Sequence, residues 1–92
     1  MTVYAASYDL RKPGRNYQPL WDRLGQWKAI RVLESFWLID ANPNSAAAIR
    51  DDLRKYIDAN DGLLVAALSG EAAWHNLKPG SDQYLLKHFG SG

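Results

Sequence analysis

The order of the β-like and helical patterns is the feature that most constrains the fold of this chain. Residues 3–8 are β-rich and almost continuously apolar, which predicts a central strand covered on both faces. Residues 30–39 exceed a typical strand in length, so we interpret them as two short strands, or one bent strand, changing direction near Glu34 and Ser35. Residues 63–68 are wholly apolar and predict a further strand.

Two helices are predicted between these strands. The first is expected to begin with Asn16 as its N-cap, and the second with Ser45, after a turn at residues 42–44. In both segments the apolar side chains recur with the period of one helix face. These apolar positions are Tyr17, Leu20, Trp21, Leu24 and Trp27 in the first helix, and Ile49, Leu53, Tyr56 and Ile57 in the second.

This order of strand, helix, strand, strand, helix and strand predicts the fold class. Two βα units with right-handed crossovers and an antiparallel sheet give an α+β, ferredoxin-like βαββαβ arrangement. A small α+β domain with a different strand order is the alternative. The 92 residues suffice for one domain, so we expect a single ferredoxin-like domain over residues 1–92, with its core at about 3–68.

A C-terminal extension at residues 70–89 follows the predicted core. Residues 72–74 are expected to form a short edge strand, and Ser81 is expected to cap a short helix with Leu85, Leu86 and Phe89 on one side. The simplest role for this segment is to cover an edge of the sheet. Docking of a partner, by strand addition or helix packing, is the alternative.

The composition excludes several classes of protein. The chain has no cysteine, which excludes disulfides, thiolate catalysis and cysteine-ligated zinc. No apolar run approaches the roughly 18–20 residues of a membrane helix, and the N-terminus lacks the basic segment of a secretory signal. We therefore expect a cytoplasmic protein that has no membrane partner.

The charge is unevenly distributed along the chain. Residues 1–31 carry six basic and two acidic residues, whereas residues 32–92 carry five basic and eight acidic ones, for a net charge of +1. A basic N-terminal third can face phosphate while the remainder stays acidic. Such asymmetry is also common in small domains that bind no nucleic acid.

Several other polar and aromatic residues are interpreted as structural. We expect His75 and His88 to be surface or satisfied core residues, and the pair Asp51 and Asp52 to lie on a solvated helix face. The aromatic residues Tyr17, Trp21 and Trp27 are expected in the core, not on a base-stacking platform.

Asp9 is the strongest candidate for chemistry. It follows the first predicted strand at its carboxyl end, where open α/β sheets place their ligands, and it precedes the basic loop at residues 11–15. Magnesium needs only one or two carboxylates when phosphate and water supply the other ligands, so Asp9 beside this loop suits Mg²⁺ and phosphate. The alternative is that Asp9 only ends the strand or pairs with Arg11 or Arg15.

A homodimer would give such a site a second carboxylate. If two Asp9 side chains face each other across a two-fold axis, the dimer holds two acids where one protomer holds one. That pair would share one ion, or space two ions for in-line phosphodiester cleavage.

Three short segments carry a resemblance to a known family. They are Tyr8-Asp9 at the end of the first strand, Arg31-Val32-Leu33-Glu34-Ser35-Phe36-Trp37 in the middle, and Ile57-Asp58 leading to Asp61 and the last apolar strand. In order and spacing, over about residues 3–68, they resemble the small CRISPR-associated proteins of the Cas-two family. Leu33 stands where the family's central signature has Gln. The loop with Pro13-Gly14 and the C-terminal helix are more similar to a side branch of that family, and the VapD-type ribonuclease toxins share its fold.

The resemblance implies a ferredoxin-like homodimer that acts as a Mg²⁺-dependent endonuclease on RNA or double-stranded DNA. Asp9 would bind the metal at the dimer axis. The implied catalytic residues are Asp9, Tyr8, Arg31 and Ser35, with Trp37 close to the same cleft. Arg11, Lys12, Arg15 and Arg31 would hold the nucleic-acid backbone. Some family members are instead DNA-binding scaffolds for the CRISPR integrase, so a non-catalytic nucleic-acid-binding or scaffold dimer is the alternative function.

Overall fold

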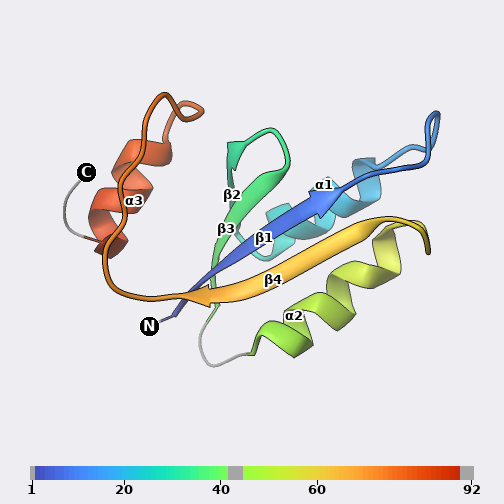
Figure 1. Cartoon of the computed structure of the whole chain (residues 1–92), viewed down its shortest axis with the longest axis horizontal. Coiled ribbons are helices and arrows are strands. Elements are labelled where there is room, and N and C mark those ends of the chain that lie inside the picture. Colours follow the sequence, from blue (N-terminus) through green and yellow to red (C-terminus); the bar gives the residue numbers. More distant parts are fainter. Residues whose placement is uncertain (1, 42–44, 90–92) are drawn as a thin grey trace.

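A four-stranded sheet with helices on both faces forms the framework of the computed structural model, which describes residues 2–41 and 45–89 (Figure 1). The predicted turn at residues 42–44 lies outside the described residues. In chain order the elements are β1 (Val3–Asp9), α1 (Gln18–Gln26), β2 (Ile30–Leu33), β3 (Phe36–Asp40), α2 (Ala46–Leu53), the 3₁₀ turn η1 (Arg54–Tyr56), β4 (Gly62–Leu68) and α3 (Ser81–Phe89).

The strands lie in the order β2-β3-β1-β4, and every neighbouring pair is antiparallel. It follows that β1 runs parallel to β2 with β3 between them, and β3 runs parallel to β4 with β1 between them. Two interlocked βαβ units produce this arrangement, so the α+β prediction is confirmed. The stretch over residues 30–39 does divide at Glu34 and Ser35, and the register between β2 and β3 shifts between Arg31 and Leu33.

The two faces of the sheet carry separate hydrophobic clusters because side chains alternate along a strand. Tyr4, Ala6 and Tyr8 of β1 face α1 and α2, where Leu20, Leu24, Ile49 and Leu53 are fully buried. Val3 and Ala5 face the other way, towards α3 and its buried Leu85. Figure 1 shows α3 at the end of the sheet where β1 begins and β4 ends, far from the loop that follows β1.

The expected edge strand at residues 72–74 is absent, and this prediction was wrong. The segment instead crosses the sheet face opposite α1 and α2, where Trp74 and Leu77 pack against the cluster around Leu85. One backbone hydrogen bond, from Lys78 N to the Val32 carbonyl at 3.1 Å, fastens it to the edge strand β2. The apolar side chains of this segment therefore cover a face of the sheet, and residues 72–74 do not pair with β2 through the backbone hydrogen bonds of a strand.

The helix starts agree with the sequence only in part. The hydroxyl of Ser45 accepts a hydrogen bond from Ala48 N, so the predicted cap of α2 is confirmed. Tyr17, not Asn16, is the N-cap of α1, although Asn16 Oδ1 does accept a hydrogen bond from Gln18 N at 3.0 Å. Ser81 is the first residue of α3 and does not cap it, because its buried Oγ finds no partner among the described residues. Within the described ranges, every helix is too short or too polar to traverse a bilayer.

Candidate functional site

The basic loop between β1 and α1 is held in shape by the carboxylate of Asp61. One carboxylate oxygen accepts a hydrogen bond from Arg11 N at 2.7 Å, at the start of the loop. The other accepts from the phenol of Tyr17 at 2.7 Å, at its end, and from Asp58 N at 2.8 Å. The turn before β4 thus fixes both ends of a loop that is about fifty residues distant in sequence.

The pKa values of this pair follow from the same contacts. Burial alone would raise the pKa of Asp61, but hydrogen bonds from Arg11 N and the Tyr17 phenol outweigh burial and hold it below its usual value. Burial and the hydrogen bond to Asp61 both raise the pKa of Tyr17. Asp61 is therefore an ionised anchor at neutral pH, and Tyr17 remains a neutral donor.

The loop cations project outwards over carboxylates that lie deeper. Lys12 Nζ is 3.9 Å and Arg15 Nη1 is 3.7 Å from Asp58 Oδ1, and the Asp58 side chain is only 18% exposed while that of Lys12 is 61% exposed. The Arg15 guanidinium also lies over the Tyr17 ring, 5.6 Å from its centroid. These long ion pairs leave the guanidinium and ammonium groups able to reach a second anion.

Asp9 extends from the end of β1 on the sheet face opposite Tyr8. Its side chain is 71% exposed and accepts a 3.0 Å bond from Arg11 Nε, whose Nη1 reaches the Asn60 carbonyl at 3.1 Å. Gly62 of β4 makes room for this arrangement, since a Cβ there would lie 3.0 Å from Arg11 Nη2. Pairing of Asp9 with Arg11, one of the two alternatives left open by the sequence, is thus present.

Asp9 is the residue of this site that the sequence predicts as a metal ligand. Across residues 2–41 and 45–89, no three His, Cys, Asp or Glu side chains gather in a group that could hold a metal ion. The one candidate ligand, Asp9, already carries a guanidinium, which an ion would have to displace. The magnesium site stays a prediction, since one or two carboxylates suffice for Mg²⁺ when phosphate and water supply the other ligands.

Tyr8 lies at the centre of a polar cluster beneath α1. Its buried hydroxyl accepts hydrogen bonds from the indole nitrogens of Trp21 and Trp37, both at 3.0 Å, and donates to the Glu34 carbonyl at 3.3 Å. Arg31 donates to the same carbonyl at 2.9 and 2.6 Å, and its guanidinium lies 5.1 Å from the Trp21 ring centroid and 5.6 Å from that of Trp37. The cluster binds the β2–β3 turn to the end of β1.

The predicted catalytic residues therefore meet at one end of the sheet but on different faces. Tyr8, Arg31 and the turn that contains Ser35 lie together, and the Ser35 carbonyl accepts a bond from Tyr8 N at 3.1 Å. Asp9 lies on the opposite side with Arg11 and Gly62. Within one protomer, the contacts of Asp9 are with Arg11 and not with Tyr8, Arg31 or Ser35.

Sequence reasoning missed two further interactions. The role of Asp61 was not foreseen, although its place in the Asn60-Asp61-Gly62 turn marks it as a residue able to accept backbone N–H groups. Asp52 was expected on a solvated face, which was wrong. It accepts two bonds from Arg23, at 2.7 and 3.0 Å, and one from Trp27 Nε1 at 2.7 Å, and so joins α2 to α1. Asp51, its neighbour, is exposed as expected.

The chain was compared with known families and structures. No family model matches it, and no solved structure matches it either. The resemblance to the Cas-two family consequently stays a prediction drawn from residues 3–68.

Proposed function

We propose that this protein binds the phosphate backbone of nucleic acid through the loop at residues 11–15. The observation that carries this proposal is the arrangement around Asp58 and Asp61, in which deep carboxylates hold the loop and its cations extend beyond them. A preformed loop loses little conformational entropy when it binds a ligand. We expect the protein to be cytoplasmic, a location in which nucleic acid is available as a ligand.

A salt titration tests this proposal. Binding of a labelled single-stranded RNA and of a duplex DNA would be followed by fluorescence anisotropy, at several salt concentrations, for the wild type and for the double variant Arg11→Gln/Lys12→Gln. Each lost phosphate contact should reduce the slope of log K against log salt by about 0.7–0.9. We expect the variant to lose affinity for both ligands and to have the smaller slope.

The control removes equal charge at other exposed positions. Lys28 and Lys87 are exposed and lie outside the loop, so Lys28→Gln/Lys87→Gln changes the net charge by the same amount. Equal losses in the two double variants would mean that only net charge matters, and the loop would not be the binding surface. Binding that does not respond to salt would also contradict the proposal.

A second candidate function is Mg²⁺-dependent cleavage of RNA or double-stranded DNA by a homodimer. Its support is that the exposed Asp9 and Leu64, which is 67% exposed, lie on the same face of the β1–β4 pair, where a partner protomer can reach both residues. Two Asp9 carboxylates would then hold the metal, while Tyr8, Arg31 and Ser35 would fix the strand end from which Asp9 extends. Arg31 would contact the nucleic-acid backbone through the exposed edge of its guanidinium group.

Cleavage by purified protein, with Mg²⁺ and with EDTA, separates the two functions. The variant Asp9→Asn should lose all metal-dependent cleavage and remain a folded dimer. Equal cleavage by wild type and variant would identify a contaminating nuclease and remove the endonuclease proposal. Binding without cleavage would favour the non-catalytic dimer, for which a CRISPR integrase is the partner that the family resemblance suggests.

A further inference from the structure

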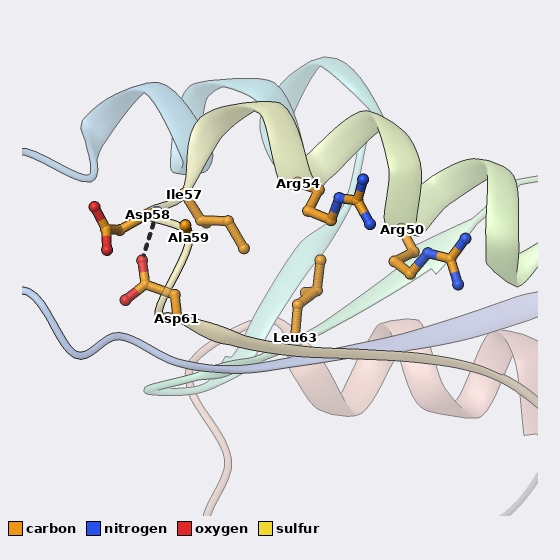
Figure 2. Close-up of a pocket in the computed structure, with 7 residues that line it drawn as sticks. All are labelled: Arg50, Arg54, Ile57, Asp58, Ala59, Asp61 and Leu63. Atoms are coloured by element: carbon orange, nitrogen blue, oxygen red, sulfur yellow. Dashed lines mark hydrogen bonds between the residues drawn. The ribbon is translucent and has the colours of Figure 1, made fainter.

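A cavity of about 520 Å³ lies between the end of α2, the turn that follows it and the start of β4 (Figure 2). Its volume is in the range of small-molecule sites. The lining divides into three parts, with carboxylates at one end, guanidinium groups at the other and apolar side chains between them. The lining residues are Arg50, Arg54, Ile57, Asp58, Ala59, Asp61 and Leu63.

The carboxylate end of the cavity is already satisfied. Asp61 accepts three hydrogen bonds, of which two anchor the basic loop and the third comes from Asp58 N, the dashed line in Figure 2. Asp58 faces Lys12 and Arg15 on its outer side. Because these acids have partners within the protein, this end adds little attraction for a cationic ligand.

The guanidinium end has unused donors. The Arg54 side chain makes no hydrogen bond or ion pair with any residue that the structure describes, whereas its backbone N–H caps α2. The Arg50 side chain bonds to Asp51, through Nε at 3.0 Å and Nη2 at 2.8 Å, and its Nη1 has no partner among the described residues. The two residues are one helical turn apart, and Figure 2 shows both side chains leaving the helical side of the cavity.

We propose that this cavity binds a nucleoside monophosphate, with its phosphate on Arg54 and Arg50 and its ribose and base over Leu63 and Ile57. A phosphate monoester offers several strong acceptor oxygens and nearly two negative charges at neutral pH, which two guanidinium groups can match. The apolar wall offers contact area to a planar base. This proposal does not depend on nucleic-acid binding by the loop. A free nucleotide and the 5′ end of a strand both present a phosphate monoester, so either could occupy the cavity.

Calorimetric titrations with four ligands test the proposal: adenosine monophosphate, inorganic phosphate, adenosine, and a dinucleotide with a 5′-phosphate. Adenosine monophosphate should bind more tightly than either phosphate or adenosine, because only it contacts both the guanidinium groups and the apolar wall. The dinucleotide distinguishes a free nucleotide from a strand end as the ligand. It should bind as tightly as adenosine monophosphate only if the cavity accepts a strand end. Equal affinity for phosphate and for adenosine monophosphate would overturn the nucleotide assignment.

Three variants assign the binding to the cavity. Arg54→Gln should lower the affinity for adenosine monophosphate by about tenfold. Lys55→Gln makes the same charge change at the next residue, and its affinity should stay within about twofold of the wild type. Ala59→Trp fills the cavity at an exposed position and should abolish binding without any charge change. Urea unfolding of each variant verifies that it folds.

The loop variant Arg11→Gln/Lys12→Gln distinguishes this proposal from the proposed function. It should lose affinity for oligonucleotides and keep its affinity for adenosine monophosphate. If the loop variant instead loses its affinity for adenosine monophosphate, the cavity is not the nucleotide site. The same conclusion follows if Lys55→Gln lowers the affinity as much as Arg54→Gln does.

Discussion

The phenol of Tyr17 donates a 2.7 Å hydrogen bond to Asp61 Oδ2 across 44 residues of sequence. This contact joins the start of α1 to the turn before β4, and the second oxygen of Asp61 holds Arg11 N. The basic loop is thereby fastened at both ends to one carboxylate. Its shape depends on the protein's own contacts and not on a ligand.

Replacement of Tyr17 by Phe should destabilise the protein by about 1–3 kcal/mol. The substitution leaves a carboxylate oxygen short of one donor in a half-buried position, and loss of a hydrogen bond to a charged group costs about this much. Urea unfolding at pH 7 measures the change. Tyr56→Phe is the matched control, since the Tyr56 hydroxyl makes no hydrogen bond with the described residues, and its effect should be within about 0.5 kcal/mol.

Replacement of Tyr8 by Phe should be more damaging. It leaves the indole N–H groups of Trp21 and Trp37 without their common acceptor, and each unsatisfied buried donor costs about 1–3 kcal/mol. The free energy of unfolding and the tryptophan emission spectrum would both report the change. An unchanged stability together with lost nuclease activity would instead identify Tyr8 as a catalytic residue that touches the substrate.

Replacement of Tyr84 by Phe should not lower the free energy of unfolding, unlike the two preceding substitutions. The Tyr84 hydroxyl is buried with no partner among the described residues, and burial, assisted by the nearby Asp40 carboxylate, raises the pKa of Tyr84 to about 12. Removing a hydroxyl that makes no hydrogen bond relieves its desolvation penalty, so the variant should be as stable as the wild type or up to about 1 kcal/mol more stable. A loss of several kcal/mol in chemical denaturation would show that the hydroxyl has a partner.

Stability should fall in acid partly because of Asp52. The hydrogen bonds from Arg23 lower the pKa of Asp52 more than burial raises it, and Trp27 lowers it further. A carboxyl with a lowered native pKa stabilises the fold fully above its unfolded value, near about 3.9, and loses that contribution as the pH falls through the native value. Asp52→Asn should be about 1–3 kcal/mol less stable at pH 7.

Denaturation midpoints of the wild type and Asp52→Asn, measured from pH 7 down to about pH 2, test this linkage. The difference between the two proteins should shrink in acid. Asp51→Asn is the matched control, because the exposed Asp51 carboxylate forms a surface ion pair with Arg50 and its loss should change stability little at any pH. A constant difference across the whole range would contradict the role given to Asp52.

The strands were predictable because their apolar patterns are local. Residues 3–8 and 63–68 lie within β1 and β4, and the break at Glu34 and Ser35 was placed correctly. The segment at residues 72–74 was misread since its apolar pattern fits an edge strand and a face-covering loop equally well. Only the tertiary position of Trp74, against the second cluster, separates the two.

The candidate site was predictable in part for a similar reason. A basic loop beside Asp9 is visible in the sequence, and the pairing of Asp9 with Arg11 is a contact between near neighbours. The contacts of Asp61 with Arg11 and Tyr17, and of Asp52 with Arg23 and Trp27, join residues at least 25 positions apart. No spacing rule connects such residues, because the fold alone brings them together.

Consecutive residues of β1 belong to different sides of the molecule. Ala6 is fully buried on the side of α1 and α2, whereas Ala5, one peptide bond away, is buried on the side of α3. A bulkier residue at either alanine would strain one half of the molecule and spare the other. Isotope-labelled methyl groups of these two adjacent alanines, which add no bulk, would thus report the loosening of the two helical layers independently.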